Sequence, residues 1–308
     1  MSDISLHHIT KTYEKGQIKA VDNISFEVAK GELFGLIGPD GAGKTSILRM
    51  LTTLLLPDGG HATVNGLDIV TEYKSIRNRI GYMPGKFSLY QDLSVEENLN
   101  FFATLFNTSV EQNYDLIKDI YVQIEPFKKR RAGKLSGGMK QKLALCCALI
   151  HKPVILFLDE PTTGVDAVSR KELWEMLKSL KKQNITILVS TPYMDEANLC
   201  DKIALIQSGK ILFVDTPANI VSAYGENLYS IKSGDRKKLL EDLRHVENIK
   251  SCFSFGEYLH FTLLKENNDS IAQLVHSLKE KNQATIEIEK IEPTIEDCFI
   301  KLMSEEKN

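Results

Sequence analysis

The chain has 308 residues, of which 43% are hydrophobic and 26% charged, a composition typical of a globular protein of about two domains. Its net charge of −3 gives no reason to expect a nucleic-acid-binding surface, and its five cysteines form no C-x-x-C pair and no metal-binding spacing. We find no signal-peptide pattern at the N-terminus, and the longest apolar runs fall far short of the roughly 20 residues of a membrane helix. The sequence therefore predicts a reduced cytosolic protein that does not cross a membrane by itself.

Two stretches near the start of the chain, residues 4–9 and 20–28, alternate apolar and polar residues and predict a pair of strands joined by a turn. Tyr13 lies in that turn, where its ring could stack on adenine or could be an ordinary surface aromatic. Its position alone does not decide between the two.

A phosphate-binding motif comes next, between an apolar run (residues 33–37) that reads as a strand and a run (residues 47–51) that reads as a helix. In this context the glycines turn backbone N–H groups around an anion at a helix N-terminus. Lys44 can then reach the β- and γ-phosphates, and the Thr45 hydroxyl can ligate Mg²⁺. The alternative, a glycine-rich turn that binds nothing, fits the flanking strand and helix less well, so we predict a nucleoside triphosphate site. The motif consists of Gly38, Pro39, Asp40, Gly41, Ala42, Gly43, Lys44, Thr45 and Ser46.

The middle of the chain is predicted to be mostly helical. After a hairpin at 61–69 and a strand at 80–83, Ser94 and Glu97 form a capping box, and helical periodicity continues to about residue 149. Within this region Ser136, Gly137 and Gly138 precede a helix, which is a second anion-binding design, although a capped helix start without a ligand has the same pattern.

An apolar run at 154–158, predicted to be a central parallel strand, ends in Asp159 and Glu160. Asp159 lies where a ligand close to Mg²⁺ is needed, and Glu160 lies where a base could polarise water against a γ-phosphate. Two acids at a strand end can instead cap a helix, but the phosphate-binding motif favours the catalytic interpretation.

The rest of the chain contains a predicted helix at 169–182, a strand at 185–190, a helix with Thr191 as N-cap and Pro192 in its first turn, and a closing hairpin. Beyond a change of composition the order reads strand 228–231, helix 236–245, strand 249–255, strand 258–264, helix 270–281, strand 284–291 and a short helix, 294–303. This βαββαβ order is that of a ferredoxin-like α+β domain, in which we find no catalytic motif.

Taken together, these motifs resemble the ATP-binding subunits of ABC transporters, and the C-terminal segment is similar to the accessory domain of the daunorubicin-exporter-like group. The resemblance implies an α/β P-loop NTPase fold with a mixed sheet, an antiparallel β subdomain and a helical subdomain at about 86–150. It implies an ATP-binding domain at 1–218, a linker at 219–226 and a ferredoxin-like accessory domain at 227–308.

The family resemblance also implies the residue roles. Tyr13 would contact adenine, residues 38–46 the phosphates and Mg²⁺, Asp159 the Mg²⁺, and Glu160 would be the base. In a head-to-tail dimer, Ser136, Gly137 and Gly138 would contact the nucleotide of the partner, and residues 164–166, with Asp166, would couple the two sites. The resemblance implies ATP and Mg²⁺ as cofactors and integral-membrane subunits as partners, with the chain on the cytoplasmic face of the cell membrane.

Two positions depart from the family pattern: Gly85 stands where glutamine is expected and Pro192 where the switch histidine is expected. Each lost contact could cost on the order of 10²-fold in rate if it acts in the transition state. We therefore expect a heterodimer with a second, consensus ATPase in preference to a homodimer. Two other classes remain: a soluble ATP-dependent switch acting on the ribosome or DNA, and an inactive structural partner. This chain contains one ATPase half, whereas soluble switches of the translation-factor type usually carry two in one chain. An intact Glu160 argues against an inactive partner, because a site used only for binding has little need of a base.

Overall fold

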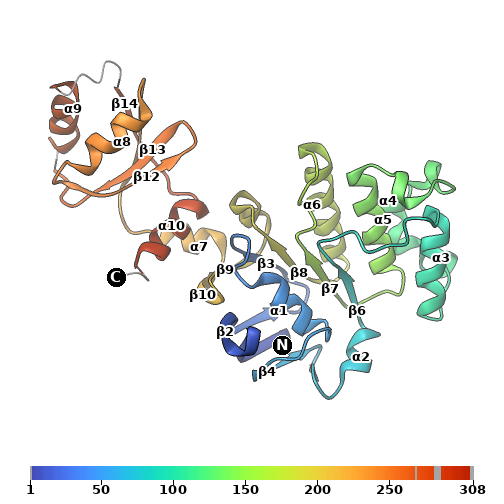
Figure 1. Cartoon of the computed structure of the whole chain (residues 1–308). Coiled ribbons are helices and arrows are strands. Elements are labelled where there is room, and N and C mark those ends of the chain that lie inside the picture. The colour runs from blue at the N-terminus through green and yellow to red at the C-terminus, as the bar shows by residue number, and fades with distance from the viewer. Residues whose placement is uncertain (1, 268, 281–285, 306–308) are drawn as a thin grey trace. The chain divides into compact units, whose positions relative to one another are not determined.

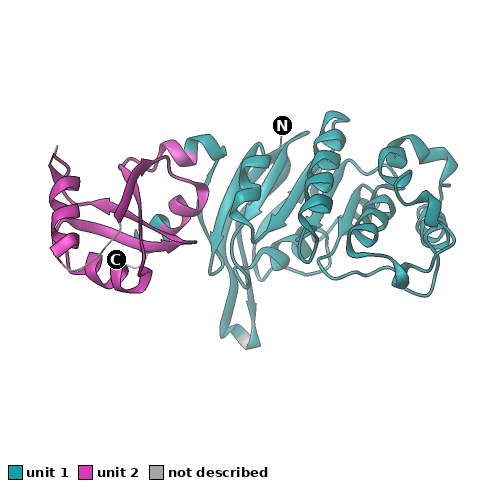
Figure 2. Cartoon of the chain, turned by 90° about the horizontal axis from the view of Figure 1, so that it is seen from above, with its two compact units in different colours: residues 1–219, 301–308 teal, residues 220–300 magenta. Residues whose placement is uncertain are grey.

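The computed structural model describes residues 2–267, 269–280 and 286–305. The chain divides into two compact units, Met1–Asn219 with Lys301–Asn308, and Ile220–Ile300 (Figure 2). The boundary falls inside the predicted linker at 219–226, but part of that segment is folded, since helix α7 (Pro217–Ser222) crosses the boundary and the side chains of Ile220 and Tyr224 are buried. Apolar side chains that pack in this way turn part of the expected linker into folded structure.

The centre of the first unit is a six-stranded, mostly parallel sheet with the strand order β10-β9-β3-β8-β7-β6 (Figure 1). Its inner strands β3, β7 and β8 are buried along their whole length, as expected for strands covered on both faces. Helices α1 (Lys44–Leu51) and α6 (Ala167–Lys182) pack on this sheet. The strands are β3 (Leu33–Ile37), β6 (Ile80–Met83), β7 (Ile155–Asp159), β8 (Thr186–Thr191), β9 (Lys202–Gln207) and β10 (Lys210–Asp215).

A second, antiparallel sheet in this unit has the strand order β2-β1-β4-β5. The predicted strand pair near the N-terminus is present as its two long strands, β1 and β2, with a short 3₁₀ turn (Glu14–Gly16) between them. Its inner face shares one continuous apolar core with the central sheet and α1. The strands are β1 (Ser2–Tyr13), β2 (Ile18–Ala29), β4 (Gly59–Val64) and β5 (Leu67–Asp68).

The region from about residue 86 to 150 is helical, as predicted, and its main helices lie together beside the sheet (Figure 1). Ser94 accepts a hydrogen bond from the Glu97 N–H while Glu97 accepts one from the Ser94 N–H, which confirms the capping box. The main helices are α3 (Val95–Leu105), α4 (Tyr114–Tyr121) and α5 (Gly137–Leu149); α2 (Tyr73–Arg77) precedes them, and 3₁₀ turns lie at Glu111–Asn113, Glu125–Phe127 and Ala132–Lys134.

The segment after β8 differs from the prediction. Thr191 is the last residue of β8 rather than a helix N-cap, and the helix that follows is a 3₁₀ helix at Met194–Leu199. The reason lies in the pairing of β8 with β3, since Thr191 pairs with Ile37 and its carbonyl oxygen accepts a hydrogen bond from the Gly38 N–H. The predicted capping role of Thr191 with Pro192 is therefore wrong.

The second unit has the βαββαβ element order and an antiparallel sheet with the strand order β12-β13-β11-β14, which is the arrangement of a ferredoxin-like fold. Two helices cover one face of this sheet around a core of its own. The predicted ends at Lys281 and Ala284 lie outside the described residues. The elements are β11 (Leu228–Ser233), α8 (Arg236–Arg244), β12 (Ile249–Phe255), β13 (Tyr258–Leu263), α9 (Ser270–Glu280), β14 (Ile286–Ile291) and α10 (Ile295–Glu305).

A buried polar pair in the second unit was not predicted from the sequence. Nδ1 of His260 on β13 lies 2.7 Å from Oδ1 of Asp297 on α10, and the Asp297 carboxylate also accepts hydrogen bonds from the backbone N–H and hydroxyl of Thr294. Burial would raise the pKa of the Asp297 carboxyl, but the hydrogen bonds from His260 and Thr294 outweigh it and leave the pKa below its usual value.

This arrangement predicts an acid-sensitive unit. A carboxyl with a lowered pKa in the folded state adds stability that is complete above its unfolded pKa of about 4 and is lost as the pH falls below it. Asp297→Asn should therefore flatten the loss of hydrogen-exchange protection in β13 and α10 between about pH 5 and pH 3. Asp269→Asn, at an exposed carboxyl, should keep the wild-type pH dependence. Equal behaviour of the two variants would contradict the assignment.

Candidate nucleotide-binding and hydrolysis site

The phosphate-binding motif forms the loop between β3 and α1, as predicted. Gly43 has a φ of 106°, and a Cβ there would lie 2.2 Å from the carbonyl oxygen of Ala20, so this position accepts only glycine. At Gly38 a Cβ would lie 2.1 Å from the Ile206 carbonyl oxygen. Gly43 caps α1 without a side-chain hydrogen bond, which leaves the first N–H groups of the helix for an anion.

The other residues of the loop show how tightly its backbone is held. Pro39 accepts a hydrogen bond from the Ala42 N–H, and Ala42 is buried and accepts one from the Gly209 N–H. Asp40 and Gly41 are exposed at the tip of the loop, with Gly41 at a φ of 78°. The loop therefore has a fixed base and an accessible tip, as a phosphate-binding loop requires.

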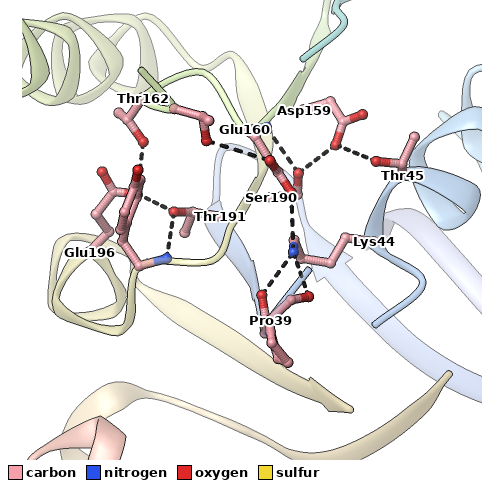
Figure 3. A network of polar contacts seen from close by, with 12 residues as sticks. Pro39, Lys44, Thr45, Asp159, Glu160, Thr162, Ser190, Thr191 and Glu196 are labelled. Carbon is pink, nitrogen blue, oxygen red and sulfur yellow. Dashed lines mark hydrogen bonds and ion pairs between the residues drawn. The ribbon is translucent and has the colours of Figure 1, made fainter. Parts of the chain in front are cut away.

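Lys44 is only 3% exposed, and its amine lies at the centre of a polar network (Figure 3). The amine donates hydrogen bonds to the carbonyl oxygens of Gly38 and Pro39 at 2.8 and 2.9 Å and lies 3.2 Å from Oε1 of Glu160. A buried ammonium needs such partners because its desolvation is costly. Phosphate oxygens could replace the carbonyl oxygens of Gly38 and Pro39 as acceptors. They would then compete with the Glu160 carboxylate for the Lys44 ammonium group.

Asp159, the last residue of β7, meets the phosphate-binding loop through Thr45. The Thr45 hydroxyl donates to Oδ1 of Asp159 at 3.1 Å, and the Ser190 hydroxyl donates to the same oxygen at 2.7 Å (Figure 3). The pairing of Asp159 with Ser190 across β7 and β8 brings these two side chains together. Ser190 was not predicted as a site residue from the sequence, although its place at the end of the neighbouring parallel strand could have indicated it.

Glu160 follows Asp159 with a φ of 51°, a left-handed conformation that is rare for a residue other than glycine. Its N–H donates to the carbonyl oxygen and to the hydroxyl oxygen of Ser190, both at 3.1 Å. Its carboxylate faces Lys44 and accepts a weak hydrogen bond of 3.4 Å from the Thr163 hydroxyl. The left-handed backbone thus turns this carboxylate from the strand end toward Lys44.

Two further residues predicted for the site, Tyr13 and Asp166, each contact the start of a helix. The Tyr13 hydroxyl is 3.1 Å from Oγ of Ser46, so this exposed ring lies beside the start of α1. Asp166 is the N-cap of α6 and accepts hydrogen bonds from the backbone N–H groups of Val168 and Ser169. The contact with the Ser169 N–H is the main cause of the lowered pKa of Asp166, which keeps this cap ionised.

The second predicted anion-binding element, Ser136 with Gly137 and Gly138, lies at the start of α5. Ser136 is the N-cap of α5 and accepts a hydrogen bond from the Met139 N–H, as predicted, and Ser136 and Gly137 are exposed. Gly138 is buried against α6, where a Cβ would lie 2.6 Å from Oγ of Ser169. Among the described residues, no hydrogen bond or ion pair joins Ser136, Gly137 or Gly138 to the phosphate-binding loop. Ser136 and Gly137 are thus accessible from outside the chain at the start of α5.

The two positions that depart from the family pattern both border the site. A Cβ at Gly85 would lie 3.0 Å from the Asp159 carbonyl oxygen and 3.9 Å from Cβ of Glu160. Pro192 follows Thr191, whose carbonyl oxygen accepts the Gly38 N–H. A side chain at either position would thus lie at the edge of the network, yet neither glycine nor proline provides a side-chain hydrogen-bonding group there.

A buried carboxylate that the sequence analysis did not identify fixes the loops around these positions. Glu196, 1% exposed, accepts hydrogen bonds from the hydroxyls of Thr162 and Thr191, from Nε of Arg170 at 2.6 Å and from the indole N–H of Trp174 at 3.0 Å. Thr162 lies in the loop after β7 and Thr191 at the end of β8 (Figure 3), while Arg170 and Trp174 lie on α6. Glu196 therefore connects the segment after Glu160 to the segment that contains Pro192.

We expect Glu196→Gln to lower the free energy of unfolding by about 3 kcal/mol, because it leaves the half-buried Arg170 without its buried charge partner. The matched control is Asp195→Asn, since Asp195 also pairs with Arg170 but is 74% exposed and should cost less than about 1 kcal/mol. Urea unfolding followed by the fluorescence of Trp174, the single tryptophan of the chain, measures both variants. Similar losses in both would contradict a dominant role for Glu196.

The geometry and the fold together define a class of protein: an ATPase with a phosphate-binding loop, an acid pair at the end of the neighbouring parallel strand, and an exposed Ser-Gly-Gly helix start. A model of the ABC transporter family matches residues 21–163. Over 305 residues the chain is 37% identical to the probable multidrug ABC transporter ATP-binding protein YbhF of Escherichia coli (strain K12), covering 97% of the chain and 52% of that protein. The chain thus spans about half the length of this relative.

Two further comparisons agree with this match. Over 316 residues the chain is 33% identical to the doxorubicin resistance ATP-binding protein DrrA of Mycobacterium tuberculosis (strain ATCC 25618 / H37Rv), covering 98% of the chain and 94% of that protein. The solved dimer of the ATP-binding cassette MJ0796, bound to ADP and Pi, superposes with a TM-score of 0.63 at 25% identity over 69% of this chain and 98% of that one. The chain belongs to the ABC transporter family and carries its ATP-binding ATPase domain, so the predicted fold of that domain is confirmed.

Proposed function

We propose that this chain is the ATP-binding motor subunit of an exporter-type ABC transporter, which binds and hydrolyses Mg²⁺-ATP to drive membrane subunits. The observation that carries the proposal is that Lys44, Asp159 and Glu160 converge on the phosphate-binding loop. The Thr45 hydroxyl and Asp159 carboxylate are hard oxygen donors 3.1 Å apart, which suits Mg²⁺. The ion would neutralise phosphate charge, while Glu160 would hold the proton of the attacking water.

We place the chain on the cytoplasmic face of the cell membrane, with integral-membrane transporter subunits as partners. Within the described parts of the chain, every helix falls short of the length and apolar character that a membrane span needs. A groove of about 300 Å³ lies beside α3 and α5, and we assign it to an apolar helical segment of a membrane subunit. Pro84 lines this groove next to Gly85, so a docked helix would adjoin the hydrolysis site. Its apolar lining includes Ile80, Met83, Leu89, Phe102, Phe106 and Ala148.

We propose that the chain pairs head to tail with a second, consensus ATPase, and that its own site turns over slowly. The exposed Ser136 and Gly137 support a role in completing the site of a partner. Gly85 and Pro192 support slow turnover in the chain's own site, because the groups that should contact water and γ-phosphate are missing. A homodimer of low activity is the competing assembly.

Purification of the tagged chain in mild detergent from its native membranes, followed by mass spectrometry, tests these proposals. We expect membrane proteins with several spans and a second ATPase to co-purify. Membrane subunits with this chain alone would contradict the heterodimer. Ribosomal or DNA-bound partners without a membrane protein would instead support a soluble ATPase switch, a function that the transporter names of the relatives do not favour.

A further inference from the structure

A second cavity, of about 160 Å³, lies where the end of β7 meets the start of α5. Three segments line it: residues 83–88, the first turns of α5 and the loop after β7. The cavity therefore joins the catalytic carboxylate to the helix that begins with the Ser-Gly-Gly element. Its polar lining consists of Ser88, Lys140, Gln141, Glu160 and Thr163.

We propose that Gln141 is a positioning residue for ATP hydrolysis in this chain, whose carboxamide holds water beside Glu160. The inference rests on the proposed function. It assigns to Gln141 the contact with water that a glutamine at position 85 would make and that Gly85 cannot make. It concerns the chain's own site, since Gln141 and Glu160 line the same cavity of one chain.

Gln141 differs from the other polar residues of the cavity, of which Ser88 is exposed to bulk solvent. The Thr163 hydroxyl already donates to Glu160, and the Lys140 amine lies 5.5 Å from the centre of the Phe87 ring, a cation–π distance. The half-buried Gln141 carboxamide, by contrast, has no hydrogen-bond partner among the residues that the structure describes. Such a group is satisfied by water, and the cavity has room for several molecules.

A carboxamide is suited to this task because it offers both a donor and an acceptor, so it can orient a water whose proton Glu160 accepts. The Lys140–Phe87 contact fixes the first turn of α5 against residues 83–88, which limits how far Gln141 can move from the cavity. Position 85 lies beside the two acids at the end of β7, Asp159 and Glu160: a Cβ at this position would lie 3.9 Å from Cβ of Glu160.

The closeness of position 85 to Asp159 and Glu160 provides the test, because a glutamine at position 85 would bring a second carboxamide to these two acids. In the assembly purified from its host, with the base of any partner ATPase changed to glutamine, Gln141→Met should lower kcat about tenfold and leave KM for ATP unchanged. In a Gly85→Gln background the same change should lower kcat less than about twofold. The matched control is Gln123→Ala, at an exposed glutamine of the same domain, which should be neutral in both backgrounds.

If Gln141→Met lowers kcat equally in the wild-type and Gly85→Gln backgrounds, Gln141 acts only through the fold. If it lowers kcat in neither background, Gln141 has no role. Either result overturns the proposal. Gln141→Ala, which removes the carboxamide by truncation instead of replacing it with a thioether, should give the same pattern, and the melting temperature of each variant is measured in parallel. If Glu160→Gln abolishes turnover but Gln141→Met does not lower it, the proposed function holds and this inference fails. If no turnover depends on Glu160, both fail.

Discussion

Glu160→Gln is expected to lower kcat at this chain's own site by about 10²- to 10³-fold, because the carboxamide cannot accept the proton of the attacking water. ATP binding should survive, since the phosphate-binding loop, Lys44 and Thr45 are untouched. The structure even suggests tighter binding: Glu160 lies 3.2 Å from the Lys44 amine, and its neutralisation removes an anion that competes with the phosphates. Steady-state ATPase assays and nucleotide titration measure the two effects separately.

The control for this experiment is Lys44→Ala, which should lose nucleotide affinity as well as turnover. The asymmetric pairing predicts a second result: in the assembled pair, the corresponding change in the partner ATPase should abolish most turnover, and Glu160→Gln should reduce the total only slightly. If Glu160→Gln abolishes turnover of the pair while the partner's change does not, the assignment of the slow site to this chain is wrong.

Much of this site could be predicted because its residues lie in short, local patterns. The phosphate-binding loop is a contiguous segment whose glycines are required by backbone geometry, as the φ of 106° at Gly43 illustrates. Asp159 was predicted from the apolar strand before it, and Ser136 from the helix that it caps. In each case the neighbours in sequence determine the conformation, so no knowledge of the packing was required.

The parts that could not be predicted depend on contacts between distant segments. Glu196 lies 26 residues from Arg170, and His260 lies 37 residues from Asp297. Both pairs exist only because of how helices pack on sheets, which residue spacing does not reveal. The same holds for Thr191: its sequence pattern favours a helix cap, but pairing of β8 with β3 keeps it in the strand. The buried contact between His260 and Asp297 could not be predicted for the same reason.

The rate of the chain's own site should therefore be limited by two side chains rather than by its binding groups. Thr45, Asp159 and Glu160 occupy the places expected of them, and the missing groups are those at positions 85 and 192. Position 192 lies directly after the residue that accepts the Gly38 N–H, so a histidine there would adjoin the phosphate-binding loop. Position 85 has little spare room, but a Cβ 3.0 Å from the Asp159 carbonyl oxygen needs a shift of only a few tenths of an ångström.

We accordingly expect Pro192→His to raise kcat at this site by on the order of 10²-fold, because it supplies a donor to the γ-phosphate in the transition state. Gly85→Gln should add about tenfold rather than 10²-fold, since Gln141 already supplies part of the same function, and the double variant should gain about 10³-fold. Gly85→Ala and Pro192→Ala make the same backbone changes, including the new N–H at position 192, without adding a side-chain hydrogen-bonding group, and both should leave kcat nearly unchanged. Single-turnover ATP hydrolysis, with the partner's site silenced, measures all five proteins against wild type. Gains in the alanine variants equal to those in the glutamine and histidine variants would show that backbone freedom, and not the missing side chains, limits this site.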